Sequence, residues 1–408
     1  MIAAGGKGVQ TIAGGVTAPA GFRAAGVACG IKANGKPDLS LLVSDTVAAA
    51  AAVFTTNVAQ AAPIVVSREH LAASGGRTRA VVVNSGCANA CTGADGMRDA
   101  REMTRLTAES VGCQDAAVLV ASTGVIGVKL PMARVASGIA AAASALSHEG
   151  GGDAARAIMT TDPFSKEAAA EATIAAGTFR IGGMAKGSGM IEPMMATMLG
   201  FITTDARVAP ELLQRALKAA VDDTFNAISV DGECSTNDCV FALANGASGV
   251  ALGEGEFDVL VAALKQVCEP LAIDIVRGGE GATKLITIHV TGALTNEDAR
   301  TTARAIANSP LVKTAVHGGD PNWGRLVAVA GRATRTLVLD RARVRIGPIE
   351  LFSNGAPFDE RAPQAAEYLQ GKDITIEVDL GTGGGGASRM WSCDLTAEYV
   401  RINAEYRT

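Results

Sequence analysis

Short apolar, β-branched runs alternate with amphipathic, helix-period segments along most of this 408-residue chain. Because such short runs suit strands and the longer patterns suit helices, the alternation predicts a mixed α/β fold. Pro131 and Pro210 stand where the first turn of a helix tolerates proline. The predicted strands are Leu41–Ser44, Ile64–Ser67, Arg79–Asn84, Ala117–Ala121, Leu285–Val290, Thr336–Leu339 and Asp373–Leu380. The predicted helices are Gly96–Val111, Pro131–Leu146, Pro210–Asp222, Phe257–Val267 and Asn296–Ala307.

The composition is that of a folded protein rather than a disordered one, because 48% of the residues are hydrophobic and 19% are charged. The length suits two domains or one large domain. The net charge is −5, and lysine and arginine are scattered. A nucleic-acid partner is therefore not expected.

The location is predicted to be cytoplasmic. Eight cysteines are sparse in a chain of this length, and they form neither a CxxC pair nor a zinc spacing, so reduced thiols are expected. The N-terminal MIAAGGKGVQTIAGGV lacks the charged and apolar segments of a signal peptide. The alanine run 48–52 is too short to span a bilayer, so no membrane association is expected.

Two common catalytic classes are disfavoured. Only four histidines occur, and His289 lies inside the strand-like LITIHV, where a structural role is expected. No GxSxG elbow accompanies a histidine, and HExxH is missing, so neither a serine triad nor a metal site is predicted.

A GxGxxG pattern, Gly381 to Gly386, follows the strand-like DITIEVDL. A dinucleotide fold needs a helix next and then a second strand with an acidic residue. Here the chain ends with SRMWSCDLTAEYVRIN, which resembles a strand. A glycine hairpin is therefore preferred to a nucleotide site.

The segment 181–205 changes abruptly in character. It is glycine-rich and loop-like before Pro193 and apolar and strand-like after Thr197. The chain could be cut here without either half losing its core. Cutting before Thr197 would free an α-amino group that can act as base for its hydroxyl, and Ala196 is small enough to leave the bond accessible. A threonine that only packs in an apolar run is the alternative.

Acyl transfer also needs donors for a developing oxyanion. The segment VASTGVIG places Thr123 and Gly124 in a predicted turn after a strand, where they could offer a hydroxyl and a backbone N–H. An ordinary strand-exit turn explains these residues equally well.

Together these segments resemble the ornithine acetyltransferases, also called glutamate N-acetyltransferases, of arginine biosynthesis. The resemblance covers essentially the whole chain. Its motifs are GGVTAPAGF at 14–22, VVNSGCANACTG at 82–93, STGVIG at 122–127, TTDPFSK at 160–166, GGMAKGSGMIEP at 182–193, MATMLGFITTDA at 195–206, STND at 235–238, GGEGATK at 278–284, DPNWGR at 320–325 and the terminal AEYVRINAEYRT.

The resemblance implies a layered α/β/β/α sandwich, shared with aminopeptidases of the DmpA type and similar but not identical to the N-terminal-nucleophile hydrolase fold. It implies self-cleavage between Ala196 and Thr197. The products would be an α chain, 1–196, and a β chain, 197–408, which share one catalytic unit and associate as an α2β2 heterotetramer.

The resemblance also implies a ping-pong transfer of acetyl from N-acetylornithine to glutamate through acetyl-Thr197, with Thr123 and Gly124 holding the oxyanion. No cofactor is implied, although some members accept acetyl-CoA as a substrate. The implied substrate contacts are Thr160, Lys186, Thr197, Glu280, Asn403 and Thr408. A lysine can pair with a substrate carboxylate, and a glutamate can pair with an ammonium.

Two residues depart from the family pattern. Met194 replaces an asparagine three residues before the nucleophile, so the resemblance does not define the cleavage rate or the donor. Cys87 stands in a predicted glycine turn where asparagine is common. Two other functional hypotheses are compatible with the same residues. One is an amidohydrolase that passes the acyl group to water, and the other is an uncut, catalytically silent homologue.

Overall fold

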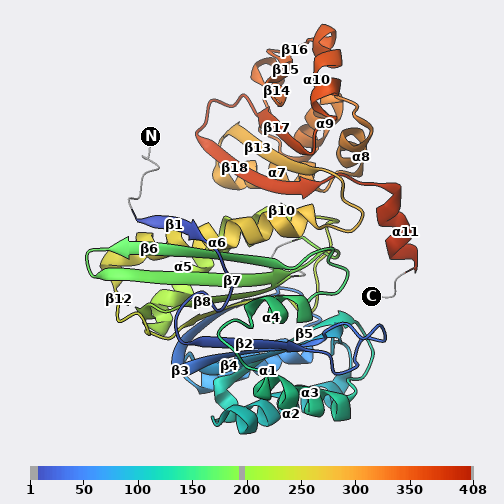
Figure 1. Ribbon diagram of the computed structural model, residues 1–408. Coiled ribbons are helices and arrows are strands. Elements are labelled where there is room, and N and C mark those ends of the chain that lie inside the picture. Colours follow the sequence, from blue (N-terminus) through green and yellow to red (C-terminus); the bar gives the residue numbers. More distant parts are fainter. Residues whose placement is uncertain (1–7, 193–197, 406–408) are drawn as a thin grey trace. The chain divides into compact units, whose positions relative to one another are not determined.

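The computed structural model describes residues 8–192 and 198–405 (Figure 1). Met194, Ala196, Thr197 and Thr408 lie outside the described residues. The described chain divides into two compact units. The first comprises residues 8–192, 198–226 and 233–275, and the second comprises residues 227–232 and 276–405.

The first unit contains most of the strands. They are β1 (Val9–Ile12), β2 (Phe22–Val27), β3 (Leu39–Phe54), β4 (Arg77–Cys87), β5 (Val118–Val125), β6 (Lys166–Ile174), β7 (Gly177–Lys186), β8 (Leu199–Thr204), β9 (Arg207–Val208), β11 (Cys239–Ala244) and β12 (Ala251–Leu252). Its helices are α1 (Ala62–Ala73), α2 (Gly93–Val111), α3 (Met132–Ser144), α4 (Gly151–Ala157), α5 (Pro210–Asp222) and most of α6 (Phe257–Arg277).

A nine-stranded sheet in the order β1-β6-β7-β8-β11-β3-β4-β5 organises this unit, with β2 added alongside β3. The long strand β3 pairs with β2 and β4 through its first part and with β11 through its last part. The sheet thus has two parts, here called wings, one built of β2–β5 and the other of β1, β6–β8 and β11.

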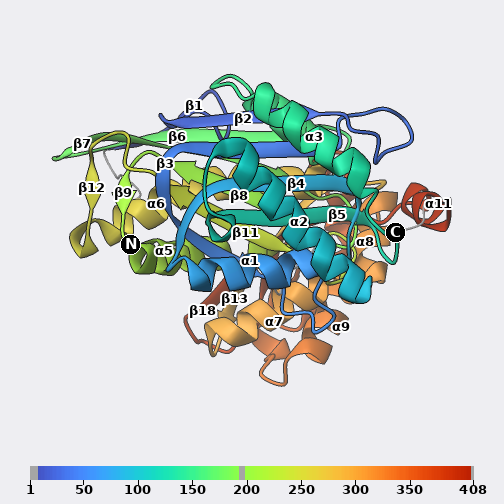
Figure 2. The ribbon, with the colours of Figure 1, turned by 90° about the horizontal axis from the view of Figure 1, so that it is seen from below.

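The two wings pack face to face. One buried cluster joins Leu42 and Val83 of the first wing to Phe201 and Phe241 of the second. A separate cluster joins the outer face of β3–β5 to α1, α2 and α3, which cover that face in Figure 2. On the other wing, Val267 and Leu271 of α6 pack directly on Gly183 of β7. The predicted α/β/β/α layering is therefore confirmed.

Strands from both sides of the segment 193–197 interleave in this sheet. Residues after the segment form β8 and β11, which lie between β7 and β3, formed by residues before it. Lys186 at the end of β7 is the register partner of Leu199 at the start of β8. The expectation that each half has its own core is therefore wrong, because the two halves share one.

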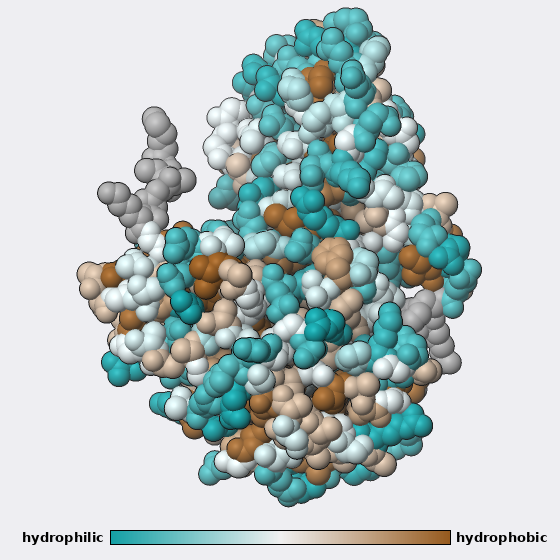
Figure 3. Space-filling view, in the orientation of Figure 1, coloured by the Kyte–Doolittle hydropathy of each residue, from teal (hydrophilic) through white to brown (hydrophobic). Residues whose placement is uncertain are grey.

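The second unit is a seven-stranded sheet in the order β10-β18-β13-β17-β14-β15-β16, with a core shared with helices α7 to α10. Its strands are β10 (Ile228–Ser229), β13 (Leu285–Ala293), β14 (Arg343–Ile346), β15 (Ile349–Ser353), β16 (Ala356–Pro357), β17 (Asp373–Asp379) and β18 (Gly386–Cys393). Its helices are α7 (Asn296–Ala307), α8 (Pro310–Gly318), α9 (Trp323–Ala333), α10 (Ala362–Tyr368) and α11 (Ala397–Glu405). Figure 3 shows that polar side chains predominate on the visible face around α10.

The glycine segment after β17 is not a hairpin. Strands β17 and β18 both pair with β13, one on each side of it, so the segment from Gly381 to Gly386 crosses the end of β13. The stretch 388–403, whose sequence resembles a strand, is strand only in its first part. It forms β18 and then α11, because Thr396 and Asp394 turn the chain onto a neighbouring loop through the hydrogen bonds described below.

Most predicted elements are confirmed, and the boundaries of α5 and α7 agree with those predicted. Two predicted strands are wrong. Ile64–Ser67 lies in α1, since Pro63 starts a helix and a short apolar run carries no period of its own. Thr336–Leu339 forms no strand, and Thr336 instead bonds the hydroxyl of Thr334.

Within residues 8–192 and 198–405, no helix combines the length and the apolar composition needed to cross a bilayer. None of the eight cysteines is in a disulfide.

Candidate active site

Thr123 and Gly124 lie near the end of β5, beside the end of β4. The two strands are parallel, and their register shifts at Gly86 and Cys87, so that Cys87 pairs with both Thr123 and Val125. A bulge of this kind re-aims the side chains next to it. The expectation of a turn after the strand is wrong, because β5 continues through the pair to Val125.

Gly124 approaches β4 too closely for any side chain. Its φ is +130°, and a Cβ atom here would lie 2.3 Å from the carbonyl carbon of Gly86 and 2.5 Å from the nitrogen of Cys87. Because both neighbours are backbone atoms, only glycine fits. The Gly124 peptide is therefore held at a fixed position, as an oxyanion-binding N–H requires.

A buried amide network supports this bulge. Ser122 donates to Asn84 Oδ1 at 2.6 Å, and Asn84 Nδ2 donates to the Cys87 carbonyl at 2.8 Å. From the other side, Asn237 Nδ2 donates to the carbonyls of Ala88 and Ser122 at 2.6 and 2.9 Å. Asn237 is not among the residues predicted from the sequence to belong to the site. The only available signal was its place in the STND motif.

Cys87 ends β4 and does not lie in a glycine turn. Its side chain is buried, and Sγ lies 3.2 Å from the Val128 carbonyl oxygen. Burial raises the pKa of the thiol, so Cys87 stays protonated and unreactive at neutral pH.

Lys186, the last residue of β7, reaches Thr123 from the opposite wing. Its ammonium Nζ donates to Thr123 Oγ1 at 3.0 Å, and the lysine is only 3% exposed. A hydroxyl that accepts from an ammonium must direct its own hydrogen elsewhere. Lys186 therefore fixes Thr123 as a donor, and the positive charge strengthens that donor.

Asp162 organises the surroundings of Lys186 and Thr160. Its Oδ1 accepts from Lys166 Nζ at 2.6 Å and from the Gly187 N–H at 2.8 Å. Its Oδ2 accepts from the Thr160 N–H at 3.0 Å. Burial alone would raise the pKa of Asp162, but the ammonium groups of Lys166 and Lys186 outweigh it and hold the pKa at about 2.

A further lysine, not among the predicted site residues, lies in this neighbourhood. Lys32 Nζ donates to the carbonyls of Pro37 and Met159, both at 2.7 Å, directly before Thr160. Its stem runs past Gly86, whose Cβ would lie 3.1 Å from Lys32 Cγ. Burial lowers the pKa of Lys32 to about 8, with the nearby charge of Lys186 adding to the effect. This wall of the site is therefore rich in positive charge.

In the second unit, the structure brings Glu280 and Asn403 together. Asn403 Nδ2 donates to Glu280 Oε2 at 2.9 Å, joining α11 to the loop before β13. Glu280 is only 7% exposed, whereas Asn403 is exposed. Thr396 Oγ1 also donates to the Gly281 carbonyl at 2.8 Å.

Asp394 anchors the same loop. Its buried carboxylate accepts from Thr283 N and Oγ1, from Lys284 N and from His317 Nδ1, over 2.5 to 2.9 Å. These bonds overcome burial and lower the pKa of Asp394. The loop that carries Glu280 is thus held by Asp394, directly after β18, as well as by α11.

The remaining predicted site residues, Ala196, Thr197 and Thr408, lie outside the described residues, as does Met194. Within the described ranges, no three His, Cys, Asp or Glu side chains gather closely enough to hold a metal ion.

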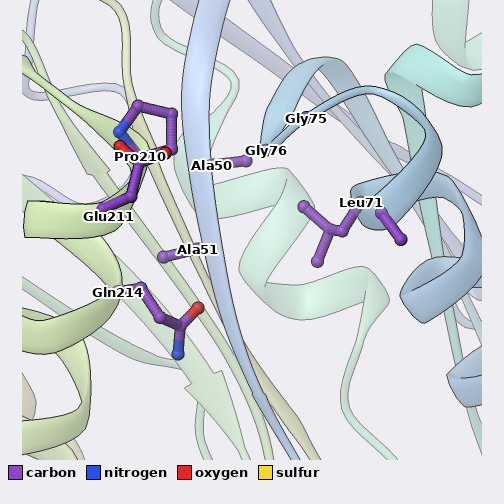
Figure 4. Close-up of a pocket in the computed structure, with 9 residues that line it drawn as sticks. Ala50, Ala51, Leu71, Gly75, Gly76, Pro210, Glu211 and Gln214 are labelled. Carbon is purple, nitrogen blue, oxygen red and sulfur yellow. The ribbon is translucent and has the colours of Figure 1, made fainter.

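A depression of about 330 Å³ lies elsewhere in the first unit, where the end of α1 and the start of α5 flank β3 (Figure 4). None of the predicted site residues lines it. Its walls are Ala50, Ala51, Leu71, Ala72, Gly75, Gly76, Pro210, Glu211 and Gln214.

Residues 23–408 match the ArgJ family. A relative from Symbiobacterium thermophilum, named arginine biosynthesis bifunctional protein ArgJ, is 52% identical over 407 residues, which cover 98% of this chain and 100% of the relative. A relative of the same name from a Synechococcus strain is 51% identical over 98% of this chain and 99% of its own length.

Two solved structures are also similar. One is the arginine biosynthesis bifunctional protein ArgJ of Bacillus halodurans, 40% identical, with a TM-score of 0.43 over 47% of this chain and 97% of that one. The other is the ornithine acetyltransferase of Mycobacterium tuberculosis in complex with ornithine, 41% identical, with a TM-score of 0.43 over 47% of this chain and 99% of that one.

Proposed function

Because this chain belongs to the ArgJ family, and is therefore an acetyl-transferring enzyme of arginine biosynthesis, we propose that its reaction runs through an acetyl ester of Thr197. The donor is N-acetylornithine and the acceptor is glutamate. The enzyme is an acyltransferase, and amide exchange between two amino acids needs no cofactor.

The nucleophile is made by hydrolysis of the peptide bond between Ala196 and Thr197. One water is consumed, and the products are a carboxylate on Ala196 and a free amine on Thr197. That amine has an ordinary pKa near about 8, so near neutral pH part of it is a base that can take the hydroxyl proton. The α chain 1–196 and the β chain 197–408 stay together, which is consistent with the pairing of β7 with β8.

In the first half-reaction, Thr197 Oγ attacks the acetyl carbonyl carbon. The C–N bond breaks, the hydroxyl proton passes to the leaving amine, and ornithine departs. Glutamate then attacks the ester with its amine, and the proton returns to Thr197. The two half-reactions together move one acetyl group and leave the enzyme unchanged.

Thr123 Oγ1 and the Gly124 N–H bind the oxyanion in both half-reactions. The observation that carries this proposal is the 3.0 Å bond from Lys186 to Thr123, which directs the hydroxyl hydrogen away from the lysine. The fixed Gly124 peptide supplies a second donor. Donors that are fixed before the charge develops stabilise the transition state more than donors that must reorient.

Recognition of the substrates rests on Thr160, Lys186, Glu280, Asn403 and Thr408, together with Thr197 itself. Lys186 is suited to a substrate carboxylate and Glu280 to the ammonium of ornithine. The buried state of both side chains favours specific pairing over a screened surface contact.

Acetyl-CoA is a second donor, as the word bifunctional in the relatives' names suggests. We further propose an α2β2 heterotetramer in the cytoplasm. Incubation of the enzyme with acetyl-CoA and glutamate alone tests the second donor. Formation of N-acetylglutamate supports it, and its absence restricts the enzyme to acetyl exchange.

Denaturing mass spectrometry tests the nucleophile. We expect two fragments, one of which begins at Thr197, and one uncut chain for Thr197→Ala. The variant should transfer no acetyl from N-acetylornithine to glutamate. An active Thr197→Ala enzyme, or an active wild type that remains one chain, would overturn the assignment.

A further inference from the structure

We propose that Lys166 is a positioning residue, which occupies the carboxylate of Asp162 and thereby keeps Lys186 on Thr123. The inference rests on the proposed role of Thr123 as an oxyanion donor. It gives a function to a buried ion pair that does not itself touch the reacting groups.

The pair formed by Lys166 and Asp162 is unusual in its burial. Both side chains are 0% exposed, and the Nζ–Oδ1 distance is 2.6 Å. Removing two charges from water is costly, so a fully buried pair contributes little to stability compared with apolar residues of similar size. Stability therefore does not explain why the Lys166–Asp162 pair is present near Thr123 and Lys186.

Lys186 is the second cation whose charge acts on Asp162. It immediately precedes Gly187, whose N–H already lies 2.8 Å from Asp162 Oδ1. The charge of Lys186 also acts on Asp162, second only to that of Lys166 among the charged neighbours. If Lys166 were neutral, Asp162 would be a buried carboxylate without its closest cation, and a turn of the Lys186 side chain would supply one.

If Lys186 turned toward Asp162, Thr123 would lose the hydrogen bond from its ammonium. The Thr123 hydroxyl could then rotate, and its hydrogen would no longer be held toward the oxyanion. Lys166 thus affects catalysis indirectly. It pairs with Asp162, and this leaves Lys186 bonded to Thr123. Because Asp162 also accepts from the Thr160 N–H at 3.0 Å, the same pair sets the position of a second predicted substrate contact.

The experiment compares acetyl transfer from N-acetylornithine to glutamate by Lys166→Met and by the double variant Asp162→Asn/Lys166→Met. The single variant should lower kcat/KM by about 10- to 100-fold, less than the roughly 10²- to 10³-fold lost when an oxyanion donor is removed, because the Thr123 hydroxyl is still present. The double variant removes the charge that captures Lys186, and the asparagine oxygen still accepts from the Gly187 N–H. The bond to the Thr160 N–H is lost, because the amide NH2 cannot accept. We therefore expect kcat to recover by about fivefold or more over the single variant, without a matching recovery of KM.

Recovery separates positioning from stability, because a purely structural pair would leave the double variant no better than the single one. That result, or a single variant within about twofold of wild type, would overturn the inference. If Lys166→Met does not fold, Lys166→Gln replaces it, since its amide still donates to Asp162.

A matched control is available on the surface. Lys218 and Asp222 have the same residue types, the same four-residue spacing and the same 2.6 Å distance, but their side chains are 66% and 38% exposed. Lys218→Met should leave kcat/KM unchanged. Failure of the proposed function itself would appear differently, as an active Thr197→Ala variant or a wild type that moves no acetyl.

Discussion

Lys186 Nζ donates to Thr123 Oγ1 over 3.0 Å, although the two residues are 63 positions apart. They belong to opposite wings of the nine-stranded sheet, on β7 and β5. The bond therefore exists only when the wings pack face to face. It joins a predicted substrate-binding cation to a predicted oxyanion donor.

Thr123→Val should remove the donor and keep the shape of the side chain. We expect kcat for acetyl transfer to fall by about 10²- to 10³-fold, as for other oxyanion donors, with little change in melting temperature. Thr123→Ser keeps the hydroxyl and is the control. A valine variant within about threefold of wild type would rule out a donor role for this hydroxyl.

Gly124→Ala should disrupt the bulge, because its Cβ would lie 2.3 Å from the backbone of Gly86. The clash and the φ of +130° together should reduce the free energy of unfolding by about 3 kcal/mol or more. Gly127→Ala is the control, since Gly127 also has a positive φ, +77°, but no neighbour within 4 Å of its Cβ position. It should lose only about 1 kcal/mol. Urea unfolding of both variants measures the difference, and equal losses would contradict the steric argument.

Much of the fold could be predicted from local patterns. The helix Asn296–Ala307 was bounded correctly, and Thr295 caps its N-terminus by accepting from Asp298 N. The run Ile64–Ser67 was misassigned, because β-branched residues favour a strand while the preceding Pro63 favours a helix start, and packing against β5 decided between them. Local patterns do not carry that tertiary contact.

For the candidate site too, local patterns predicted the residues but not the contacts between them. Thr123, Gly124, Lys186 and Glu280 were found through motifs, but the arrangement that gives them meaning was not. The bulge at Gly86, the bond from the Gly187 N–H to Asp162 and the amide bonds of Asn237 all join segments that are far apart in sequence. A sequence pattern specifies residue types at a fixed spacing. The contacts could not be predicted from it, because they depend on how the two wings pack.

Asn237→Ala should impair catalysis, although Asn237 is not a predicted substrate contact. It would leave the buried carbonyls of Ala88 and Ser122 without their amide donor, at about 1–3 kcal/mol for each unsatisfied group. Because these carbonyls flank the bulge, we expect kcat to fall more than KM rises. Steady-state kinetics below the melting temperature of the variant measure this split. A change confined to KM would show that Asn237 does not position the oxyanion donors.

Asp394→Asn should make the free energy of unfolding depend less on pH in the acidic range. The bonded form of Asp394 is the carboxylate, and its pKa in the folded protein is lower than in the unfolded chain. Its contribution is therefore fully present above the unfolded value near about 3.9 and is lost as the pH falls through the lower folded value. At pH 7 we expect the variant to be less stable by about 2 kcal/mol.

Melting curves from pH 7 to pH 3 should show this gap narrowing below about pH 4. Asp222→Asn is the control, because that carboxylate belongs to an exposed pair and should change stability by less than about 1 kcal/mol at any pH. A gap that stays constant down to pH 3 would mean that the Asp394 carboxylate is not the form that stabilises the loop.

The α fragment 1–196, produced alone, should not fold. It lacks β8 and β11, which lie between β7 and β3 and pair with strands on both sides, and it lacks Phe201 and Phe241 of the shared core. Exposed strand edges and half of an apolar core favour aggregation over a cooperative fold. Circular dichroism of this fragment should show no cooperative melting, whereas co-production with residues 197–408 should restore a single transition and co-elution in size exclusion. A fragment 1–196 that melts cooperatively by itself would contradict the shared core.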